Sequence, residues 1–333
     1  MERLRRPAAR WLIRLLWVLL AALCLRLLLR IPMADLLSVL RRLDPLSVCV
    51  ILAVNLAIVI ALPLRLSLLT RATGNPIPYH RLLLYRWGAA AISYVTPGPQ
   101  FGGEPFQYRM LKTRERLTGA DSAAITLIDR GTELVANLVF LLTAIVMFTS
   151  TRLEMKGLLY LGLAVIVPAV SLPVIYLWLL RRGARPVARI VGCGTGLVLD
   201  ALCRVENRMA TLASLHYRAI LLSLLLSLAL WIPIVAEYNI VLRALGINLA
   251  FVSTVQAMAL PRLALLSPIP GAVAVLEAAQ VFGLQALGFG PAEGLGVGLL
   301  VRVRDIVFAV LGLAAARLAA VRPLVARSAS AGI

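Results

Sequence analysis

Long apolar runs separated by short polar segments dominate the chain. A helix needs about 20 consecutive apolar residues to cross a bilayer. Six runs meet this requirement, and they cover residues 12–30, 46–64, 120–148, 157–180, 219–242 and 293–319. The runs are continuous and do not alternate at a period of two, which excludes a β-barrel. The pattern therefore predicts an all-α polytopic membrane protein with six full crossings.

Two further apolar stretches, 82–117 and 250–290, are interrupted in the middle by proline and glycine. Irregular backbone at membrane depth is tolerated only inside protein or beside a water-filled cavity. We therefore expect each stretch to form a re-entrant hairpin, which enters the membrane and returns to its own side. A short interfacial helix is expected over residues 33–43.

Charge supports this arrangement and orients it. The chain is 61% hydrophobic and only 15% charged, yet it holds 34 Lys and Arg against 15 Asp and Glu, for a net charge of +19. The basic residues lie in short loops beside apolar runs, as in membrane proteins, and do not form the basic patch of a nucleic-acid-binding domain. With the N-terminus in the cytoplasm, the inner segments hold 23 basic residues and the outer ones 6. This bias predicts a multi-pass protein of the inner cell membrane whose N-terminus and C-terminus both lie in the cytoplasm. The five remaining basic residues lie at membrane depth: Arg26, Arg130, Arg262, Arg302 and Arg304.

Two parts of the chain repeat one pattern of special residues. In each, a Pro-Gly pair is followed after five residues by Glu, then 26 or 25 residues later by Arg, with an acidic residue three positions beyond the Arg. Another glycine lies 24 or 25 positions before the glycine of each pair. The markers are Gly74, Pro97, Gly98, Glu104, Arg130 and Glu133 in the first repeat, and Gly246, Pro270, Gly271, Glu277, Arg302 and Asp305 in the second. Corresponding markers are 172 or 173 positions apart.

This repeat sets the expected domain organisation. Three predicted crossings separate the starts of the repeats, and an odd number turns the second repeat upside down, as in many secondary transporters. The expected parts are an N-terminal helix with an interfacial helix (1–45), repeat 1 with a cytoplasmic-side hairpin (46–148), a connecting transmembrane helix with a basic cytoplasmic loop (149–218), repeat 2 with an outer-side hairpin (219–320) and a cytoplasmic tail (321–333).

The chemistry of the repeated motif suits a phosphate group. Glycines permit close backbone approach, and Pro ends an entering helix, so that a new half-helix would aim free N–H groups inward. Arg130 and Arg302 add forked donors that match a phosphodiester. Glu104 and Glu277 are candidates to neutralise these arginines, to take up a proton or to meet a cationic headgroup. The alternative is that the charges only pair with one another as packing bridges or as i,i+3 pairs.

The candidate substrate-binding and translocation residues are Pro97, Gly98, Gln100, Gly102, Gly103, Glu104, Arg130, Glu133, Pro270, Gly271, Glu277, Arg302 and Asp305. Asp129, Glu237 and Arg304 are weaker candidates.

The sequence does not favour a metal site, a catalytic site, a disulfide or a methyltransferase loop. His80 and His216 are solitary, so no metal site, catalytic residue or cofactor is expected. Cys193 and Cys203 are expected to remain thiols, since this topology places them in the reducing cytoplasm. The segment 192–196, followed by Asp200, has the glycine spacing of a methyltransferase loop but lacks the preceding strand, so we expect a basic connector there.

The segment Thr96-Pro97-Gly98-Pro99-Gln100-Phe101-Gly102-Gly103-Glu104-Pro105 resembles the first signature of the lysylphosphatidylglycerol synthase transmembrane-region family, and Pro268-Ile269-Pro270-Gly271 with Glu277 and Arg302 resembles the second. The resemblance extends over residues 45–320. The family includes the flippase half of the multiple peptide resistance factor, which moves aminoacylated phosphatidylglycerol between leaflets. Ala272 and Ala274 stand where the family often has glycine. No soluble aminoacyltransferase domain follows residue 320, so a lysyl-lipid substrate is not implied.

The leading hypothesis is thus a lipid translocator without enzymatic activity, which moves a phospholipid or a polyisoprenyl-phosphate-linked lipid between leaflets. Its expected partners are lipids with anionic headgroups, and a homo-oligomer is compatible with the predicted membrane architecture. A membrane-embedded transferase is one alternative, although Asp35 and Asp44 are the only acidic pair in an expected outer loop. A secondary transporter of a soluble anion is another.

Overall fold

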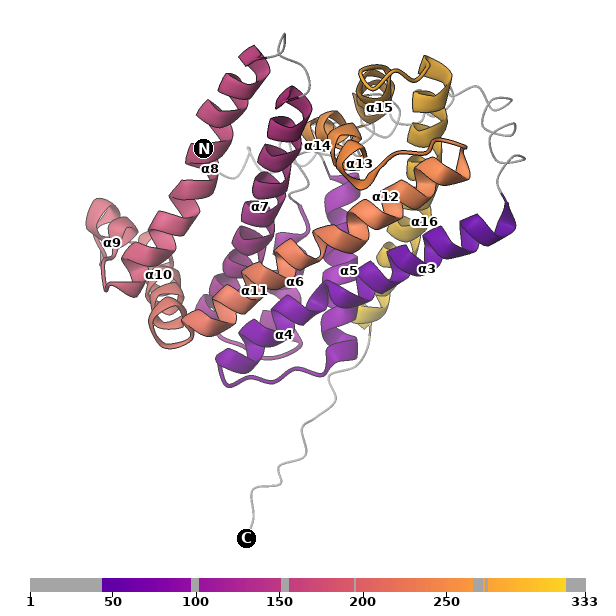
Figure 1. Ribbon diagram of the computed structural model, residues 1–333. Helices are drawn as coiled ribbons and strands as arrows, with labels where there is room; N and C mark the ends of the chain where they lie inside the picture. The colour runs from indigo at the N-terminus through magenta and orange to yellow at the C-terminus, as the bar shows by residue number, and fades with distance from the viewer. Residues whose placement is uncertain are drawn as a thin grey trace, which may run out of the picture.

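The computed structural model describes residues 44–96, 102–150, 156–194, 196–265, 272 and 275–321. Within these ranges the chain is helical and contains no strand, which confirms the all-α class (Figure 1). The helices are α3 (Pro45–Ala61), α4 (Pro63–Ala72), α5 (Tyr79–Val95), α6 (Glu104–Thr113), α7 (Gly119–Ser150), α8 (Lys156–Arg181), α9 (Pro186–Val191), α10 (Leu197–Leu215), α11 (Tyr217–Ala229), α12 (Trp231–Ala244), α13 (Phe251–Ala257), α14 (Ala259–Ala264), α15 (Val275–Gln285) and α16 (Pro291–Val321).

Four segments of the described chain are long and apolar enough to cross a membrane. They are Pro45–Ala72, Gly119–Thr149, Gly162–Arg181 and Tyr217–Ala244. Each contains or nearly contains one of the predicted crossings, and together they make the chain a polytopic membrane protein. The predicted crossing at 12–30, the interfacial helix at 33–43 and most of the tail lie outside the described residues.

The predicted crossing at 293–319 corresponds to α16, which has 31 residues. Its length suits a bilayer, since helices rise about 1.5 Å per residue. However, Arg302, Arg304, Asp305 and Arg317 interrupt its apolar run. The crossing by α16 therefore stays a prediction.

The first span continues past its predicted end at residue 64. Leu62 separates α3 from α4, and Pro63 occupies the first turn of α4. Proline is tolerated at this position because its missing N–H would have no partner within the helix. The helical path therefore extends to Ala72 and carries Arg65 into the interior of the protein.

The two interrupted stretches also form broken helices. Helix α5 ends at Val95 and α6 begins at Glu104, while α14 ends at Ala264 and α15 begins at Val275. In the sequence, each Pro-Gly pair lies between the two helices. Five predicted site residues in the breaks lie outside the described residues: Pro97, Gly98, Gln100, Pro270 and Gly271.

The helices on either side of the connector form a first half, α3–α7, and a second half, α11–α16, which pack extensively on each other. One buried apolar cluster lies mainly among α4, α5, α6 and α7, and another mainly among α12–α16. Between the halves, α4 packs on α11 and α3 on α12, so these two broken spans run antiparallel (Figure 1). Helix α5 packs along α16, and α13 and α14 pack on α7.

Small residues bring α5 and α16 together. A Cβ atom placed on Gly88 would lie 2.8 Å from Ala316 Cβ, and one on Gly312 would lie 2.7 Å from Ala91 Cβ. The indole N–H of Trp87 donates to the Phe308 carbonyl at 3.0 Å. Close backbone approach through small residues is the usual packing of helices in membranes, where apolar burial alone gives little driving force.

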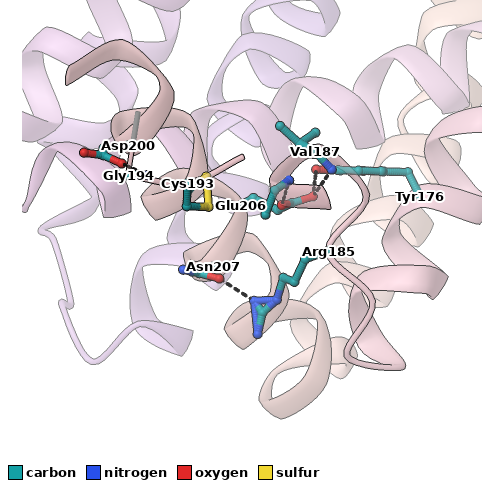
Figure 2. The surroundings of a disulfide bond; sticks show 10 residues. Tyr176, Arg185, Val187, Cys193, Gly194, Asp200, Glu206 and Asn207 are labelled. Carbon is teal, nitrogen blue, oxygen red and sulfur yellow. Dashed lines mark hydrogen bonds between the residues drawn. A yellow bond between two sulfur atoms is a disulfide. The ribbon is translucent and has the colours of Figure 1, made fainter. Parts of the chain in front are cut away.

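Helices α8, α9 and α10 connect the halves, and a disulfide joins Cys193 to Cys203 in this connector (Figure 2). The expectation that both cysteines stay thiols is therefore wrong. It considered only the compartment, whereas the fold brings the two Cα atoms to 6.2 Å. The Glu206 carboxylate holds α9 against α10 because it accepts the N–H groups of Val187 and Ala188, each at 2.8 Å.

Within the glycine-rich segment, residues 192–194 follow α9, and Gly196 precedes α10 in this connector. Gly194 N–H donates to the Asp200 carboxylate at 2.6 Å. The described part of the chain provides no strand before this turn, so the segment lacks the context of a methyltransferase loop.

Candidate functional site

Four helices of the first half bring charged side chains to one place. Arg65 comes from α4, Arg86 from α5 and Glu104 from the first turn of α6. Helix α7 supplies Asp129, Arg130 and Glu133, which lie within about one turn of each other. We call these six residues the first ion cluster. It contains three arginines and three carboxylates, so its formal charges balance.

Glu133 is the centre of this cluster. Its Oε2 atom accepts from Arg65 Nη2 at 3.0 Å and pairs with Arg130 Nη1 at 3.0 Å. Arg86 Nη2 donates to the same oxygen. Three guanidinium groups thus surround one carboxylate, an arrangement that would equally suit an oxygen of a phosphate group.

Asp129 completes the buried side of the cluster. Its carboxylate lies 3.5 Å from Arg65 Nε and accepts from Gln107 Nε2 at 3.3 Å. Arg65 also donates from Nη1 to Ser227 Oγ of α11 at 2.9 Å, which links the cluster to the second half. The Arg65 side chain is 1% exposed and Asp129 2%. Charges buried this deeply are strongly destabilising unless they are paired, as they are here.

Glu104 and Arg130 form the accessible side of the cluster. Glu104 Oε1 lies 3.0 Å from Arg130 Nε, and the two side chains are 24% and 16% exposed. The second carboxylate oxygen of Glu104 accepts Gly102 N–H at 2.7 Å. Gly103 permits this arrangement, because a Cβ atom there would lie only 2.0 Å from the Ala89 carbonyl oxygen of α5. The sequence prediction of close backbone approach at this glycine is confirmed.

The second half holds a corresponding second ion cluster of Glu237, Glu277, Arg302, Arg304 and Asp305. Arg302 Nη2 lies 2.6 Å from Glu277 Oε1, and Arg302 Nη1 donates to Tyr94 Oη of α5 at 2.9 Å. Arg304 donates to Glu237 at 2.6 Å and pairs with Asp305 at 2.7 Å.

A cavity of about 50 Å³ adjoins the second ion cluster. Glu237, Arg262, Gln280, Arg304 and Asp305 contribute polar groups to its wall. The guanidinium of Arg262 also lies over the ring of Trp231, 4.7 Å from its centroid. Such stacking stabilises a cation away from water.

The structure therefore assembles most of the described candidates. Glu104, Arg130 and Glu133 contact one another, as do Glu277 and Arg302, while Asp305 pairs with Arg304. Gly102 and Gly103 position Glu104. The weaker candidates Asp129, Glu237 and Arg304 are full members of the two clusters.

Arg65 and Arg86 are functional candidates that sequence reasoning missed. Both were counted among the 23 basic residues of the inner loops, yet both are buried beside Arg130. That part of the loop count is wrong. The available signal was Arg65 between Leu64 and Leu66, at the end of an apolar run that Pro63 does not stop.

Comparison with protein families decides the classification. The family model described as the lysylphosphatidylglycerol synthase TM region matches residues 11–312. The chain belongs to the lysylphosphatidylglycerol synthase TM region family. The resemblance seen in the sequence motifs is thereby confirmed, and the match includes both halves and both ion clusters of this family member. A search of the curated proteins finds no significant match.

The site chemistry of this lysylphosphatidylglycerol synthase TM region is that of paired charges. Among the residues that the structure describes, no group of three or more His, Cys, Asp or Glu side chains is placed to hold a metal ion. The clusters instead offer guanidinium groups whose present partners are carboxylates. An incoming phosphate would compete with these carboxylates for the guanidinium groups, and a displaced Glu133 carboxylate would keep its remaining arginine partners.

Proposed function

We propose that this protein moves a lipid with a phosphate headgroup between the two leaflets of the cell membrane. The observation that carries the proposal is the convergence of Arg65, Arg86 and Arg130 on one carboxylate oxygen of Glu133. Ionisable groups inside membrane proteins are costly and usually mark a pathway. The side chains of Glu133 and Glu104 are 28% and 24% exposed, which supports the approach of a headgroup to this cluster.

The exchange works as follows. A phosphate oxygen approaches from the accessible side, where Glu104 and Arg130 lie. The guanidinium of Arg130 turns from its carboxylates to the phosphate and forms two parallel hydrogen bonds. Glu133 keeps Arg65 and Arg86 as partners, and Glu104, at the accessible side, keeps the Gly102 N–H. The buried pair Arg65–Asp129 stays in place and keeps the site formed. Acyl chains remain in lipid throughout, so only the headgroup needs a polar path.

An inverted repeat would give the second half the same role at the opposite leaflet. Helix starts correspond at Pro45 and Tyr217, at Tyr79 and Phe251, and at Gly119 and Pro291, each pair 172 positions apart. The contacts are reciprocal, since the first hairpin helix of each half packs on the last helix of the other. Reciprocal contacts of this kind are typical of two-fold symmetry.

The same proposal includes the topology. Between Pro45 and Tyr217 lie three candidate spans, Pro45–Ala72, Gly119–Thr149 and Gly162–Arg181, and an odd number reverses the second half. Helix α16 then crosses as well, with an outward apolar face that includes Val310 and Leu318. Together with the run at 12–30 this gives six crossings, two re-entrant hairpins and cytoplasmic termini.

The test is headgroup movement in proteoliposomes that contain a fluorescent phosphatidylglycerol. Arg130→Gln and Arg302→Gln should each abolish the movement, because each removes a forked donor from one cluster. The double variant Glu104→Gln/Arg130→Gln removes one positive and one negative charge, so the net charge of the cluster stays zero. This variant should fold but be inactive. Arg208→Gln serves as a matched control, since Arg208 pairs with Asp121 at 3.0 Å outside both clusters.

Two outcomes would refute the proposal. Unchanged lipid movement in both single variants would show that the clusters are structural. Movement of inorganic phosphate across the liposome membrane, without movement of lipid, would favour a transporter of a soluble anion. Incubation of the purified protein with lipid substrates, followed by mass analysis for new products, tests the expectation that it is not an enzyme.

A further inference from the structure

An apolar groove opens on the side of the helix bundle, and no residue of either ion cluster lines it. Its volume is about 370 Å³, within the usual range of roughly 300–1,000 Å³ for ligand pockets. Helices α7, α8, α10 and α11 form its walls. The wall residues are mainly aliphatic, and they include Leu127, Val135, Val174, Leu177, Met209 and Leu224. We call it the lateral groove.

Prolines in α8 account for the opening. Ile166, Ala169 and Val170 pack against Leu138 and its neighbours on α7. Pro173 follows within the same helix and lines the groove. A proline inside a helix removes one backbone hydrogen bond and bends the axis, so α8 can diverge from α7 beyond this point. Helix α10 packs on both helices near the lower end of α8 (Figure 1).

Part of the groove wall lies where two candidate spans end. One candidate span ends at Arg181 and another begins at Tyr217, and both residues line the groove. The Arg181 guanidinium lies over the Tyr217 ring, 4.2 Å from its centroid, and that of Arg182 lies 4.0 Å from the centroid of Trp178. Tyr and Trp prefer this interfacial level of a bilayer, where arginines meet lipid phosphates.

Positive charge beside the groove is not neutralised by the protein. Arg181, Arg182 and Arg218 are exposed, and within the described ranges no carboxylate forms an ion pair with any of them. By contrast, the arginines of the two ion clusters are paired with carboxylates. Arg181 lines the groove itself, while Arg182 and Arg218 lie near the rings of its lining residues Trp178 and Tyr217. The groove thus combines an apolar interior with cations beside it.

We propose that the lateral groove binds one glycerophospholipid with an anionic headgroup. One acyl chain lies between α7, α8 and α11, and the phosphate lies against Arg181, Arg182 and Arg218. The charge and apolarity of the site match the two ends of such a lipid. This inference is independent of the proposed translocation, because the groove shares no residue with either ion cluster.

Native mass spectrometry of the purified protein tests the proposal, with dioleoyl phosphatidylglycerol and dioleoyl phosphatidylcholine as probes. The wild type should bind phosphatidylglycerol more tightly. Replacing Arg181, Arg182 and Arg218 together by Gln should remove this preference, at about fivefold in affinity per arginine.

A groove-filling variant tests the acyl-chain site separately. Gly131 lines the groove, and a Cβ atom there would have no atom within 4 Å, so Gly131→Leu places a side chain into the space. Binding of phosphatidylglycerol should fall at least tenfold. Gly157→Leu is the matched control, because Gly157 is a helical glycine outside the groove that also has no neighbouring atom within 4 Å. Leu127→Trp is a second filling variant should Gly131→Leu fail to fold.

Each outcome is decisive. Undiminished binding of phosphatidylglycerol to the folded filling variant would overturn the proposal, as would equal affinity of the wild type for the two lipids. Displacement of the bound lipid by inorganic phosphate alone would show that the apolar groove contributes nothing, and would also overturn it. Loss of lipid binding in Gly131→Leu with headgroup movement intact would support the groove and leave the translocation pathway elsewhere.

Discussion

Replacement of Arg65 by methionine tests whether the first ion cluster is one coupled network. Methionine keeps much of the length and apolar stem of arginine but removes its charge. The guanidinium of Arg65 is 1% exposed and contacts Glu133 at 3.0 Å, Asp129 at 3.5 Å and Ser227 at 2.9 Å. Its loss changes the cluster from neutral to a net charge of −1.

The expected cost follows from the partners that remain. Removing one member of a buried ion pair typically costs about 3–5 kcal/mol. Glu133 keeps Arg86 and Arg130, whereas Asp129 keeps only a contact with Arg86 at 3.9 Å and the amide of Gln107 at 3.3 Å. We therefore expect the lower end of this range, about 3 kcal/mol of unfolding free energy.

A second substitution separates charge from packing. Asp129→Asn in the Arg65→Met background removes the unpaired carboxylate and should restore about 1–2 kcal/mol, within the usual coupling range of roughly 0.5–3 kcal/mol for contacting residues. The measurement is unfolding in mixed micelles with increasing sodium dodecyl sulfate, followed by circular dichroism.

The control for the double-mutant cycle of Arg65 and Asp129 is Arg208→Met. Arg208 of α10 is 50% exposed and pairs with Asp121 in the first turn of α7, so its loss should cost no more than about 1 kcal/mol. If Arg65→Met were as stable as the wild type, or if Asp129→Asn gave no recovery, the coupling inferred from the distances would be refuted.

Three further predictions concern backbone contact and the connector. Gly103→Ala should lower the unfolding free energy in detergent by about 1–3 kcal/mol, because the added Cβ would overlap a carbonyl oxygen of α5. Gly131→Ala is the control and should be neutral or stabilising. Equal melting temperatures of the two variants would contradict this expectation. Glu206→Gln should release α9, so that limited trypsin digestion cuts the connector faster than in the wild type, and an unchanged digestion pattern would count against that role. Mass spectrometry after maleimide labelling should find two additional adducts only after reduction, at Cys193 and Cys203, and labelling of both without reductant would disprove the disulfide.

Much of the helix pattern could be predicted from the sequence because apolar runs directly report burial in lipid. The predicted span 120–148 lies within α7, and 157–180 lies within α8. The ends of α5 and α14 before the two Pro-Gly pairs were predictable from composition as well, since proline and glycine disfavour helix.

The partners of the charged residues could not be predicted in the same way. Arg65 and Glu133 are 68 positions apart, and hydropathy contains no information about which of two distant charges meet. Arg130 and Glu104 were found only because a second copy of the pattern exists at Arg302 and Glu277. Arg65 has no such copy, because the residue 172 positions later is Glu237.

The disulfide was missed for a different reason. Compartment predicts whether a disulfide persists, but geometry decides whether it can form. The turn between α9 and α10 places the two cysteines 6.2 Å apart at Cα, and that turn depends on contacts such as Gly194 with Asp200. None of these contacts is visible in cysteine spacing.

Arg65 and Glu237 occupy equivalent positions of the two repeats but carry opposite charges, and this has a consequence for movement of the halves. Arg65 pairs with Asp129 and Glu133 inside the first half, and Glu237 pairs with Arg304 inside the second. The contacts described across the divide are of another kind: hydroxyl groups of Ser227 and Tyr94, and small residues between α5 and α16. A movement of one half against the other would therefore break the hydrogen bonds that the Arg65 and Arg302 guanidinium groups donate to these hydroxyls, together with the packing of α5 on α16 and of α4 on α11. The ion pairs named here would stay inside each moving half.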